Sequence, residues 1–312
     1  MLDLAIVIVH YRTPHLLRDC LRSVYTSQGD LTYHVCVVDN CSGDDSCRMV
    51  EAEFPQVTLI ANETNAGYPY ANNLGLRTFG FTNPGETSRV EGPLPRYALL
   101  LNPDTRLPPT ALADMIAFLD AHPDAAVAGP RLVRQDGSLD KACRRAFPSP
   151  EVSCYHMLGL SKLFPKSERF GRYNMTYLDD RTTTEVDAVN GAFMMVRREA
   201  IAQVGLMDEA FFMYGDDLDW AYRFKEAGWK VYYNAAVNVL HYKGAASRHS
   251  RKARYEFYRA MYLFYQKHYA SRTPFWLGGL IVLGIVLKGS LAMAVEVVRG
   301  ERPPVLAAEE GP

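Results

Sequence analysis

The sequence lacks the cysteine patterns that would indicate a metal cluster or a redox centre. None of its six cysteines forms a C-x-x-C pair, and no set of them has the spacing of zinc ligands. We interpret them as reduced thiols that pack within the fold. An excess of charge is also absent, because 34 basic and 35 acidic residues give a net charge of -1. This balance argues against nucleic acid or another polyanion as the partner of the whole chain.

A targeting signal is lacking as well. No basic segment precedes the first apolar run, residues 4–9, and this run is too short for a signal-sequence core with a cleavage site. We interpret it as a buried strand, and the cytoplasm is the expected compartment. Internal repeats are also absent. A chain of 312 residues, 48% of them hydrophobic, is long enough to bury a sizeable core.

What the sequence does contain is an alternation of short apolar runs with helix-like periods. Runs typical of strands cover residues 4–9, 35–38, 57–61, 97–101, 125–128, 192–196 and 229–233. Helical patterns begin at Pro14, recur over 112–119, 220–227 and 255–269, and a Pro- and Gly-rich loop is expected over 83–96. Strands that alternate with helices predict an α/β fold with a mostly parallel sheet flanked by helices.

Polar residues follow three of the predicted strands directly. These are His10 and Tyr11, then Asp39 and Asn40, and then Asn102, Pro103 and Asp104. In sheets of this kind, ligands bind beyond the carboxyl ends of the strands. Position alone therefore makes these residues candidates for a binding site.

Asp104 is a candidate ligand for a hard cation. A carboxylate just past a buried strand can bind Mg²⁺ or Mn²⁺ through oxygen. Such a cation would bridge the phosphates of a nucleotide and neutralise charge on a departing diphosphate. Asn102-Pro103-Asp104 is also good turn chemistry, so the motif alone leaves the ligand and the turn equally open.

A second candidate is the aromatic and acidic run of residues 211–219. Asp216, Asp217 and Asp219 stand at the beginning of a predicted helix. Acids are favourable at a helix N-terminus, which explains one or two of them without a function. A carboxylate in this position can also accept a proton from an attacking hydroxyl.

His241 and the basic stretch that follows it form the third candidate. Eight Lys and Arg residues and a single acid, Glu256, lie between Lys243 and Arg272. An imidazole is a common metal ligand, and basic side chains hold phosphate. A lone histidine is more often structural, so this segment alone does not decide between the two.

The C-terminal region contains an uncharged apolar run, residues 275–287, interrupted by Lys288 and continued over 290–298. Thirteen residues at about 1.5 Å per residue do not cross a hydrocarbon core about 30 Å thick, and the longer stretch is a marginal span. The cationic segment before it would stay cytoplasmic. Spanning or interfacial attachment is one interpretation, and a buried helix or an oligomer contact is the other.

Taken in order, these motifs closely resemble the family 2 inverting glycosyltransferases with the GT-A fold, most of all their bacterial rhamnosyltransferase-like branch. The resemblance covers about residues 3–250. It rests on residues 7–12, 37–42, 65–68, 72–75, 101–104, 129–131, 136–138, 190–193 and 211–219, and on Arg223, His241, Gly244 and Ser247.

The resemblance implies a role for individual residues. Asp39 would contact the nucleotide base, and Asn102 replaces the first acid of the family's D-x-D metal motif, which leaves fewer charges on the cation. The other implied nucleotide-binding residues are His10, Tyr11, Arg12, Asn65, Gly67 and Asn72. Asp104 and His241 would hold Mg²⁺ or Mn²⁺ at the diphosphate.

For the chemical step, the resemblance implies that Asp217 is the general base. The implied acceptor site contains Asn190, Gly191, Asp216 and Trp220. Arg144 and Arg145 are weaker candidates for sugar or phosphate contacts, and we expect them to be exposed charges.

The resemblance also implies the organisation of the chain and its partners. A GT-A domain would cover 1–250, with a nucleotide-binding half (1–130) and an acceptor-binding half (131–250), followed by a basic and apolar helical extension (251–299) and a disordered tail from residue 300. The implied donor is a dTDP- or UDP-sugar, with rhamnose favoured. The implied acceptor is a cell-envelope glycan or lipid-linked saccharide at the inner face of the cytoplasmic membrane, and a homo-oligomer stays open.

Two alternatives have other expectations. A sugar nucleotidyltransferase would carry a Gly-rich phosphate loop after the first strand, where this chain has residues 10–14 of quite different composition. A non-catalytic carbohydrate-binding or membrane scaffold would have lost its acidic residues, whereas Asp39, Asp104 and Asp217 are all present.

Overall fold

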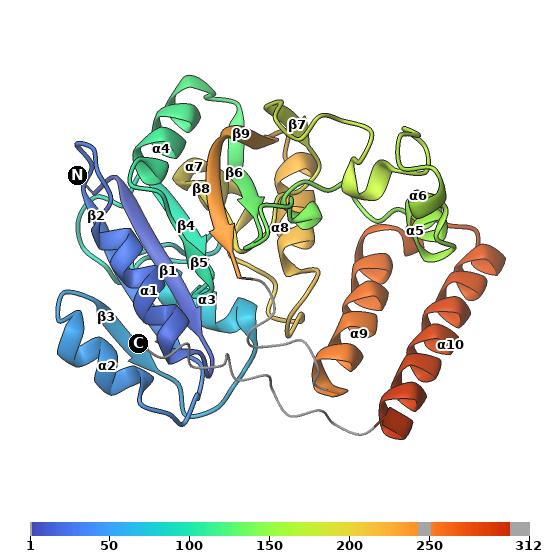
Figure 1. Cartoon of the computed structure of the whole chain (residues 1–312), viewed down its shortest axis with the longest axis horizontal. Helices are drawn as coiled ribbons and strands as arrows, with labels where there is room; N and C mark the ends of the chain where they lie inside the picture. The colour runs from blue at the N-terminus through green and yellow to red at the C-terminus, as the bar shows by residue number, and fades with distance from the viewer. Residues whose placement is uncertain (1, 243–250, 300–312) are drawn as a thin grey trace.

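A computed structural model describes residues 2–242 and 251–299 of the chain. Within these residues, nine strands form one sheet that is flanked by helices (Figure 1). The strands are β1 (Leu4–His10), β2 (Tyr33–Asp39), β3 (Thr58–Ala61), β4 (Tyr97–Leu101), β5 (Thr105–Arg106), β6 (Ala125–Val133), β7 (Thr184–Val186), β8 (Phe193–Arg197) and β9 (Lys230–His241). The order across the sheet is β3-β2-β1-β4-β8-β6-β9-β5, and β7 pairs with β9. The predicted α/β fold class is confirmed.

In the first half of the chain the helices alternate with the strands. The two longest helices follow the last strand. The helices are α1 (Pro14–Tyr25), α2 (Ser46–Glu53), α3 (Tyr68–Thr78), α4 (Ala111–Ala121), α5 (Pro150–Met157), α6 (Leu160–Leu163), α7 (Arg198–Val204), α8 (Asp216–Glu226), α9 (Arg251–His268) and α10 (Phe275–Arg299). Every residue of β1 and β4 is buried, so these central strands form the core on which the helices pack.

The sheet is mixed, which refines the expected mostly parallel arrangement. Strands β3, β2, β1 and β4 are parallel, as is β6 with β9. Strand β8 runs antiparallel to both of its neighbours, β4 and β6. A run of apolar residues has no direction, so the pattern that located β8 near residues 192–196 carried no information about its orientation.

Helix α9 contacts α8 through its side chains, and the ring centroids of Tyr222 and His268 lie 4.1 Å apart. Asp219 of α8 is buried, and its Oδ1 lies 2.8 Å from both His268 Nε2 and Lys267 Nζ. The ion pairs fix the end of α9 to the sheet-bearing part of the chain. Lys243, Gly244 and Ser247, and the tail predicted from residue 300, lie outside the described residues.

Helix α3 approaches β1 closely at Gly75. A Cβ at this position would lie 2.5 Å from Val7 Cγ1. We expect Gly75→Ala to lower the free energy of unfolding by about 1–2 kcal/mol, because the overlap outweighs the gain in helix propensity. Urea unfolding followed by circular dichroism measures this effect. Gly279→Ala is the control, since a Cβ there meets nothing within 4 Å. Equal midpoints for the two variants would contradict the close contact.

Candidate active site

The carboxyl ends of β1, β2 and β4 meet at one edge of the sheet. The parallel register pairs His10 with Asp39 and Ile8 with Leu101. Asn102 follows Leu101 directly, so the polar residues that the sequence places after three different strands are neighbours in the fold. This edge is where an α/β sheet binds ligands.

Asp39 offers a buried hydrogen-bond acceptor that is not used within the described residues. Its Oδ2 accepts a hydrogen bond from the Ser42 N–H at 3.0 Å, whereas its buried Oδ1 has no hydrogen-bond partner. A buried acceptor without a partner costs about 1–3 kcal/mol. A ligand N–H directed at Oδ1 would remove this penalty, and the imide N–H of uracil or thymine is such a donor.

His10 lies behind Asp39, which corrects the prediction that its side chain lines the pocket. The side chain is fully buried, with Nε2 2.6 Å from Ser46 Oγ and 4.0 Å from Asp39 Oδ1. Burial lowers the pKa of His10, although the charges of Asp39 and Asp44 act in the opposite direction. His10 therefore lies close to Asp39, but its hydrogen bond goes to Ser46.

Tyr11 and Arg12 form the turn after β1. Arg12 has a φ of +55°, and it donates hydrogen bonds from its N–H to Ser42 Oγ and from its Nε to the Ser42 carbonyl. Its guanidinium carbon lies 5.0 Å from the centroid of the Tyr11 ring. A non-glycine residue in the left-handed region is strained, and such strain is found at ligand sites. The turn holds a partly exposed aromatic ring and an exposed cation beside Asp39.

The turn before α3 is built by Asn65, Gly67 and Asn72. Asn65 Oδ1 accepts hydrogen bonds from the Gly67 N–H and from Asn40 Nδ2. Gly67 has a φ of +102°, and a Cβ there would lie 2.6 Å from the Phe212 carbonyl oxygen. Asn72 is fully buried and donates to the Tyr68 carbonyl. Gly67 and Asn72 shape the turn, and Asn65 is the member of the set that reaches solvent.

Asp104 and His241 lie side by side, as the family resemblance implies for two ligands of one cation. His241 Nε2 is 3.4 Å from Asp104 Oδ1, and its Nδ1 is 3.0 Å from Oδ2 of the fully buried Asp140. Burial disfavours the charged imidazolium, but hydrogen bonds and charges from Asp104 and Asp140 outweigh it and raise the pKa of His241 to about 9. The two carboxylates therefore favour positive charge at this imidazole.

The chemistry of these donors fits a divalent cation. Asp104 offers a carboxylate, His241 offers Nε2, and Asp140 can hold the opposite ring nitrogen as the outer partner that orients a metal-bound histidine. Among the described residues, no group of three or more His, Cys, Asp and Glu side chains is arranged to hold a metal ion. Two protein ligands leave the remaining coordination positions to water or to phosphate oxygens, which is the usual situation for Mg²⁺ in phosphate sites.

Three hydrogen bonds fix the carboxylate of Asp217. Its Oδ2 accepts hydrogen bonds from Arg145 at 2.6 Å and from the Gly191 N–H at 3.0 Å, and its Oδ1 accepts from the Leu218 N–H at 2.8 Å. Its side chain is 13% exposed, so it reaches solvent. The first turn of α8 therefore presents a carboxylate in a fixed orientation, held by three donors.

Asp216, the neighbour of Asp217, is buried at the first position of α8. Burial raises its pKa to about 8, the negative charge of Asp217 acts in the same direction, and Arg145 opposes both. Burial therefore favours the neutral form of Asp216. Tyr214 and Gly215, both at positive φ, make the sharp turn that delivers this pair.

Tyr68 connects the two acidic parts of the site. Its hydroxyl donates to Asn102 Oδ1 and to the Gly191 carbonyl, each at 3.1 Å. Burial raises the pKa of Tyr68, and the charges of Asp217 and Asp104 both add to this effect. The phenol therefore joins the strand end that carries Asn102 to the Gly191 turn, whose N–H bonds Asp217.

The residues predicted for the acceptor side divide into two groups. Gly191 contacts Asp217 through its N–H, and Asn190 Oδ1 accepts from the Ala192 N–H in the same turn. Trp220 is different, because it is fully buried and its indole N–H donates to the Gly205 carbonyl. The predicted acceptor contact of Trp220 is therefore wrong, and this side chain belongs to the core.

Arg144 and Arg145, expected to be exposed, are both buried. Arg144 donates to the carbonyls of Leu178 and Asp179, whereas Arg145 donates to the Val189 carbonyl and to Asp217. Together with Tyr68 and Asp140, Arg145 is a site residue that the sequence patterns missed or underrated. The signal for Arg145 was weak, since a pair of adjacent basic residues is typical of many surfaces.

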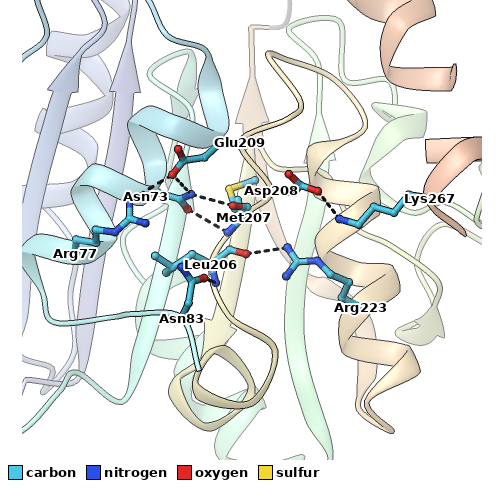
Figure 2. A pocket seen from close by; sticks show the side chains of 9 residues that line it. All are labelled: Asn73, Arg77, Asn83, Leu206, Met207, Asp208, Glu209, Arg223 and Lys267. Atoms are coloured by element: carbon cyan, nitrogen blue, oxygen red, sulfur yellow. Dashed lines mark hydrogen bonds and ion pairs between the residues drawn. The ribbon is translucent and has the colours of Figure 1, made fainter. Parts of the chain in front are cut away.

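The segment between α7 and α8, which leads to Asp216 and Asp217, is anchored on α3. Figure 2 shows Asn73 of α3 facing this segment: its Nδ2 donates to the Met207 carbonyl and to Glu209, and its Oδ1 accepts from the Met207 N–H. A cavity of about 410 Å³ lies here, and Lys267 and Arg223 also line it. It contains neither Asp104 nor Asp217, and its charged groups are paired. We interpret it as part of the support of the site.

Comparison with known proteins gives a consistent family. A family model described as "Glycosyltransferase like family 2" matches residues 3–259. The N-acetylglucosaminyl-diphospho-decaprenol L-rhamnosyltransferase of Mycobacterium tuberculosis is 27% identical over 262 residues, which is 83% of this chain and 81% of that protein. Rhamnosyltransferase WbbL of Escherichia coli is 26% identical over 229 residues, 70% of this chain and 82% of that protein.

Solved structures with the same fold are more distant in sequence. GalNAc-T7 with UDP, GalNAc and Mn²⁺ has a TM-score of 0.58 at 16% identity and covers 87% of this chain. The mannosyltransferase PcManGT of Pyrobaculum calidifontis, in complex with GDP-Man and Mn²⁺, has a TM-score of 0.55 at 16% identity and covers 97% of this chain and 77% of that one. The chain spans only 39% of TarS of S. aureus and 50% of GalNAc-T7. These similarities establish the fold and nothing finer.

Proposed function

The chain belongs to glycosyltransferase family 2, and from this premise we propose that it is an inverting, metal-dependent enzyme that moves a sugar from a nucleotide diphosphate to a hydroxyl of a cell-envelope glycan or lipid-linked saccharide. The favoured sugar is rhamnose. A UDP-hexose donor, or a scaffold that binds without turnover, is the alternative.

The observation that carries the proposal is the fixed carboxylate of Asp217 next to the Tyr68–Asn102 hydrogen bond. Arg145 and Gly191 hold Oδ2, while Oδ1 keeps a lone pair beyond its bond to the Leu218 N–H. This oxygen accepts the proton of the acceptor hydroxyl as the hydroxyl oxygen attacks the anomeric carbon. A single displacement of this kind inverts the anomeric configuration and forms no sugar–enzyme bond.

The nucleotide would lie at the carboxyl ends of β1 and β2. The unpartnered Asp39 Oδ1 supports a pyrimidine base, whose imide N–H it would accept, and uracil and thymine are equally suitable. Tyr11 and Arg12 would cover the base and sugar from the neighbouring turn.

The diphosphate would lie near Asp104 and His241. Mg²⁺ or Mn²⁺ held by these two side chains would neutralise the charge that develops on the leaving diphosphate. Asp140 fixes the ring of His241 and so selects which nitrogen faces the site. Asn102 and Tyr68 stand between this region and Asp217.

The relatives support the choice of donor and acceptor. Two of them are named as rhamnosyltransferases, and the name of the mycobacterial one specifies a lipid-linked diphosphate acceptor. An acceptor of this class would place the enzyme at the inner face of the cytoplasmic membrane. A panel of dTDP- and UDP-sugars, assayed by release of free nucleotide, tests the donor, and we expect dTDP-rhamnose to be turned over fastest. Binding of nucleotide without turnover of any donor would support the scaffold instead.

Removal of divalent cations tests the role of Asp104 and His241. We expect full chelation with EDTA to abolish transfer, and Mn²⁺ or Mg²⁺ added in excess to restore it, because the leaving diphosphate then regains its counter-charge. Initial rates of nucleotide release measure this effect, and unfolding with and without EDTA checks that the fold persists. Activity that survives chelation would remove Asp104 and His241 from a metal-binding role.

A further inference from the structure

The outer face of α10 is a continuous apolar stripe. Trp276, Leu280, Leu283, Leu287 and Leu291 follow one another at steps of three or four residues, so they share one side of the helix, and each is at least 52% exposed. Within the described residues, Phe275–Val295 is the one helix long and apolar enough to cross a membrane, with a mean hydropathy of 2.0 and only 11% of its window buried. Apolar faces of this length mark interaction surfaces.

The opposite side of α10 is packed against α9. Ile285 is buried, and the neighbouring positions on this side are glycines that allow close approach. A Cβ at Gly278 would lie 2.8 Å from Tyr265 Oη, and a Cβ at Gly289 would lie 3.2 Å from Tyr258 Cγ. The two helices run side by side in Figure 1, and these contacts hold them there.

This packing decides how α10 can meet a bilayer. Helix α9 is held to α8 by the ion pair of Lys267 with Asp219, and it also carries Arg259 paired with Glu256. If α10 spanned the membrane while packed on α9, these charges would lie in the hydrocarbon core, where they are strongly disfavoured. An α10 that lies flat keeps the charged helix on the protein side and its own leucines on the lipid side.

Helices α5 and α6 extend the same surface. Lys288 Nζ donates to the Met157 carbonyl at the end of α5, so α10 and α5 are in contact. Leu158, Leu163 and Phe164 are all more than half exposed beside this junction. Burial lowers the pKa of His156, and the positive charges of Lys162 and Lys288 lower it further. The junction therefore combines exposed apolar side chains with two lysines, which is complementary to a lipid surface with anionic headgroups.

We propose that α10, together with the α5–α6 segment (residues 150–164), is a docking surface on which the enzyme lies flat on an anionic membrane leaflet. The surface itself does not depend on the proposed function, whereas its use, the capture of a lipid-linked acceptor, rests on it. A Cβ at Gly215 would lie 3.4 Å from Ala260 Cβ, so α9 packs directly on the turn before Asp216 and Asp217. Helix α9 therefore lies between these acids and α10, and the axes of two packed helices are about 8–10 Å apart.

Vesicle flotation with the full chain tests the docking surface. We expect the protein to float with vesicles that contain about 40% phosphatidylglycerol, and to bind at least about tenfold more weakly to pure phosphatidylcholine or at about 0.5 M NaCl. The double variant Leu280→Glu/Leu287→Glu should lose at least about tenfold of the vesicle affinity. Val90→Glu, a matched change at an exposed apolar residue of the 83–96 loop, should lose none. Unfolding midpoints confirm that the variants fold.

Three results would overturn the proposal. They are wild-type protein that binds neither vesicle, a double variant that binds as well as wild type, and self-association through α10 in light scattering without vesicle binding. None of these measurements uses catalysis, so a failure here is separate from a failure of the proposed function.

The depth of α10 separates a flat helix from a spanning one. In a Trp229→Phe/Trp276→Phe background, Leu283→Trp, Leu287→Trp and Leu291→Trp each report depth through quenching by brominated lipids, and Trp220 is buried in the core. A flat helix places all three at the same shallow depth, about 5–10 Å into the headgroup and acyl boundary. In a spanning helix the three tryptophans would lie at different depths. If lipids brominated near the bilayer centre quenched one of them strongly and the others weakly, the flat orientation would be wrong.

Discussion

Asp217→Asn is expected to lower kcat by about 10²–10⁴-fold and to leave the affinity for the donor nucleotide unchanged. The amide has the size of the carboxylate and can still accept hydrogen bonds from Arg145 and the Gly191 N–H through its oxygen. It cannot take a proton from the acceptor hydroxyl. Nucleotide release with and without acceptor measures turnover, and calorimetry with the nucleotide measures binding.

The control for Asp217→Asn is a variant that breaks a similar ion pair elsewhere. Asp180→Asn removes the carboxylate that lies 2.8 Å from Arg131 and is not among the site residues. We expect both variants to lose stability and only Asp217→Asn to lose turnover. Near-wild-type turnover in Asp217→Asn would exclude this residue as the base, and Asp216 would then become the residue to test.

The strand ends of the site could be predicted because they follow from local sequence. A buried run that ends in polar residues marks a strand and its carboxyl end, and this located Asp39, Asn102 and Asp104 correctly at one edge of the sheet. The pairing of Asp104 with His241 came from the family resemblance. In the fold, Thr105 and His241 are antiparallel partners, which explains why residues so distant in sequence meet.

The supporting contacts could not be predicted, because they join segments that share no pattern. Arg145 reaches Asp217 across 72 residues, and Tyr68 reaches Gly191 across 123. His10 and Trp220 show the converse error. Both stand beside residues of the site in the sequence, but both side chains are fully buried, His10 against Ser46 and Trp220 in the hydrophobic core.

The same difficulty applies to the orientation of the sheet. The apolar run at residues 192–196 predicted a strand, and β8 is there. Its antiparallel pairing with β4 places Leu101 opposite Phe193. This pairing sets Asn102 beside the turn of Asn190 and Gly191, where the Asn102 N–H donates to the Ala192 carbonyl. The antiparallel strand is thus what brings the two halves of the site together, and no residue of β8 signals it locally.

Arg145→Met should have the second large effect, and it separates the positioning of Asp217 from general stability. The guanidinium of Arg145 is buried between the Val189 carbonyl and Asp217. Loss of one partner of a buried ion pair typically costs about 3–5 kcal/mol. Without Arg145 the Asp216 pKa should also rise further, because this guanidinium is among the charges that lower it.

Arg144→Met is the matched control, since Arg144 is equally buried but donates only to the carbonyls of Leu178 and Asp179. We expect both variants to unfold earlier in urea. At a temperature where both are folded, only Arg145→Met should show a kcat reduced by about 10²-fold, because a small displacement of a catalytic group has an effect of this size. Arg145→Lys keeps the charge and should recover part of kcat. Equal kcat values for Arg144→Met and Arg145→Met would reduce Arg145 to a structural residue, and the geometry of Asp217 would then depend on Gly191 and the first turn of α8 alone.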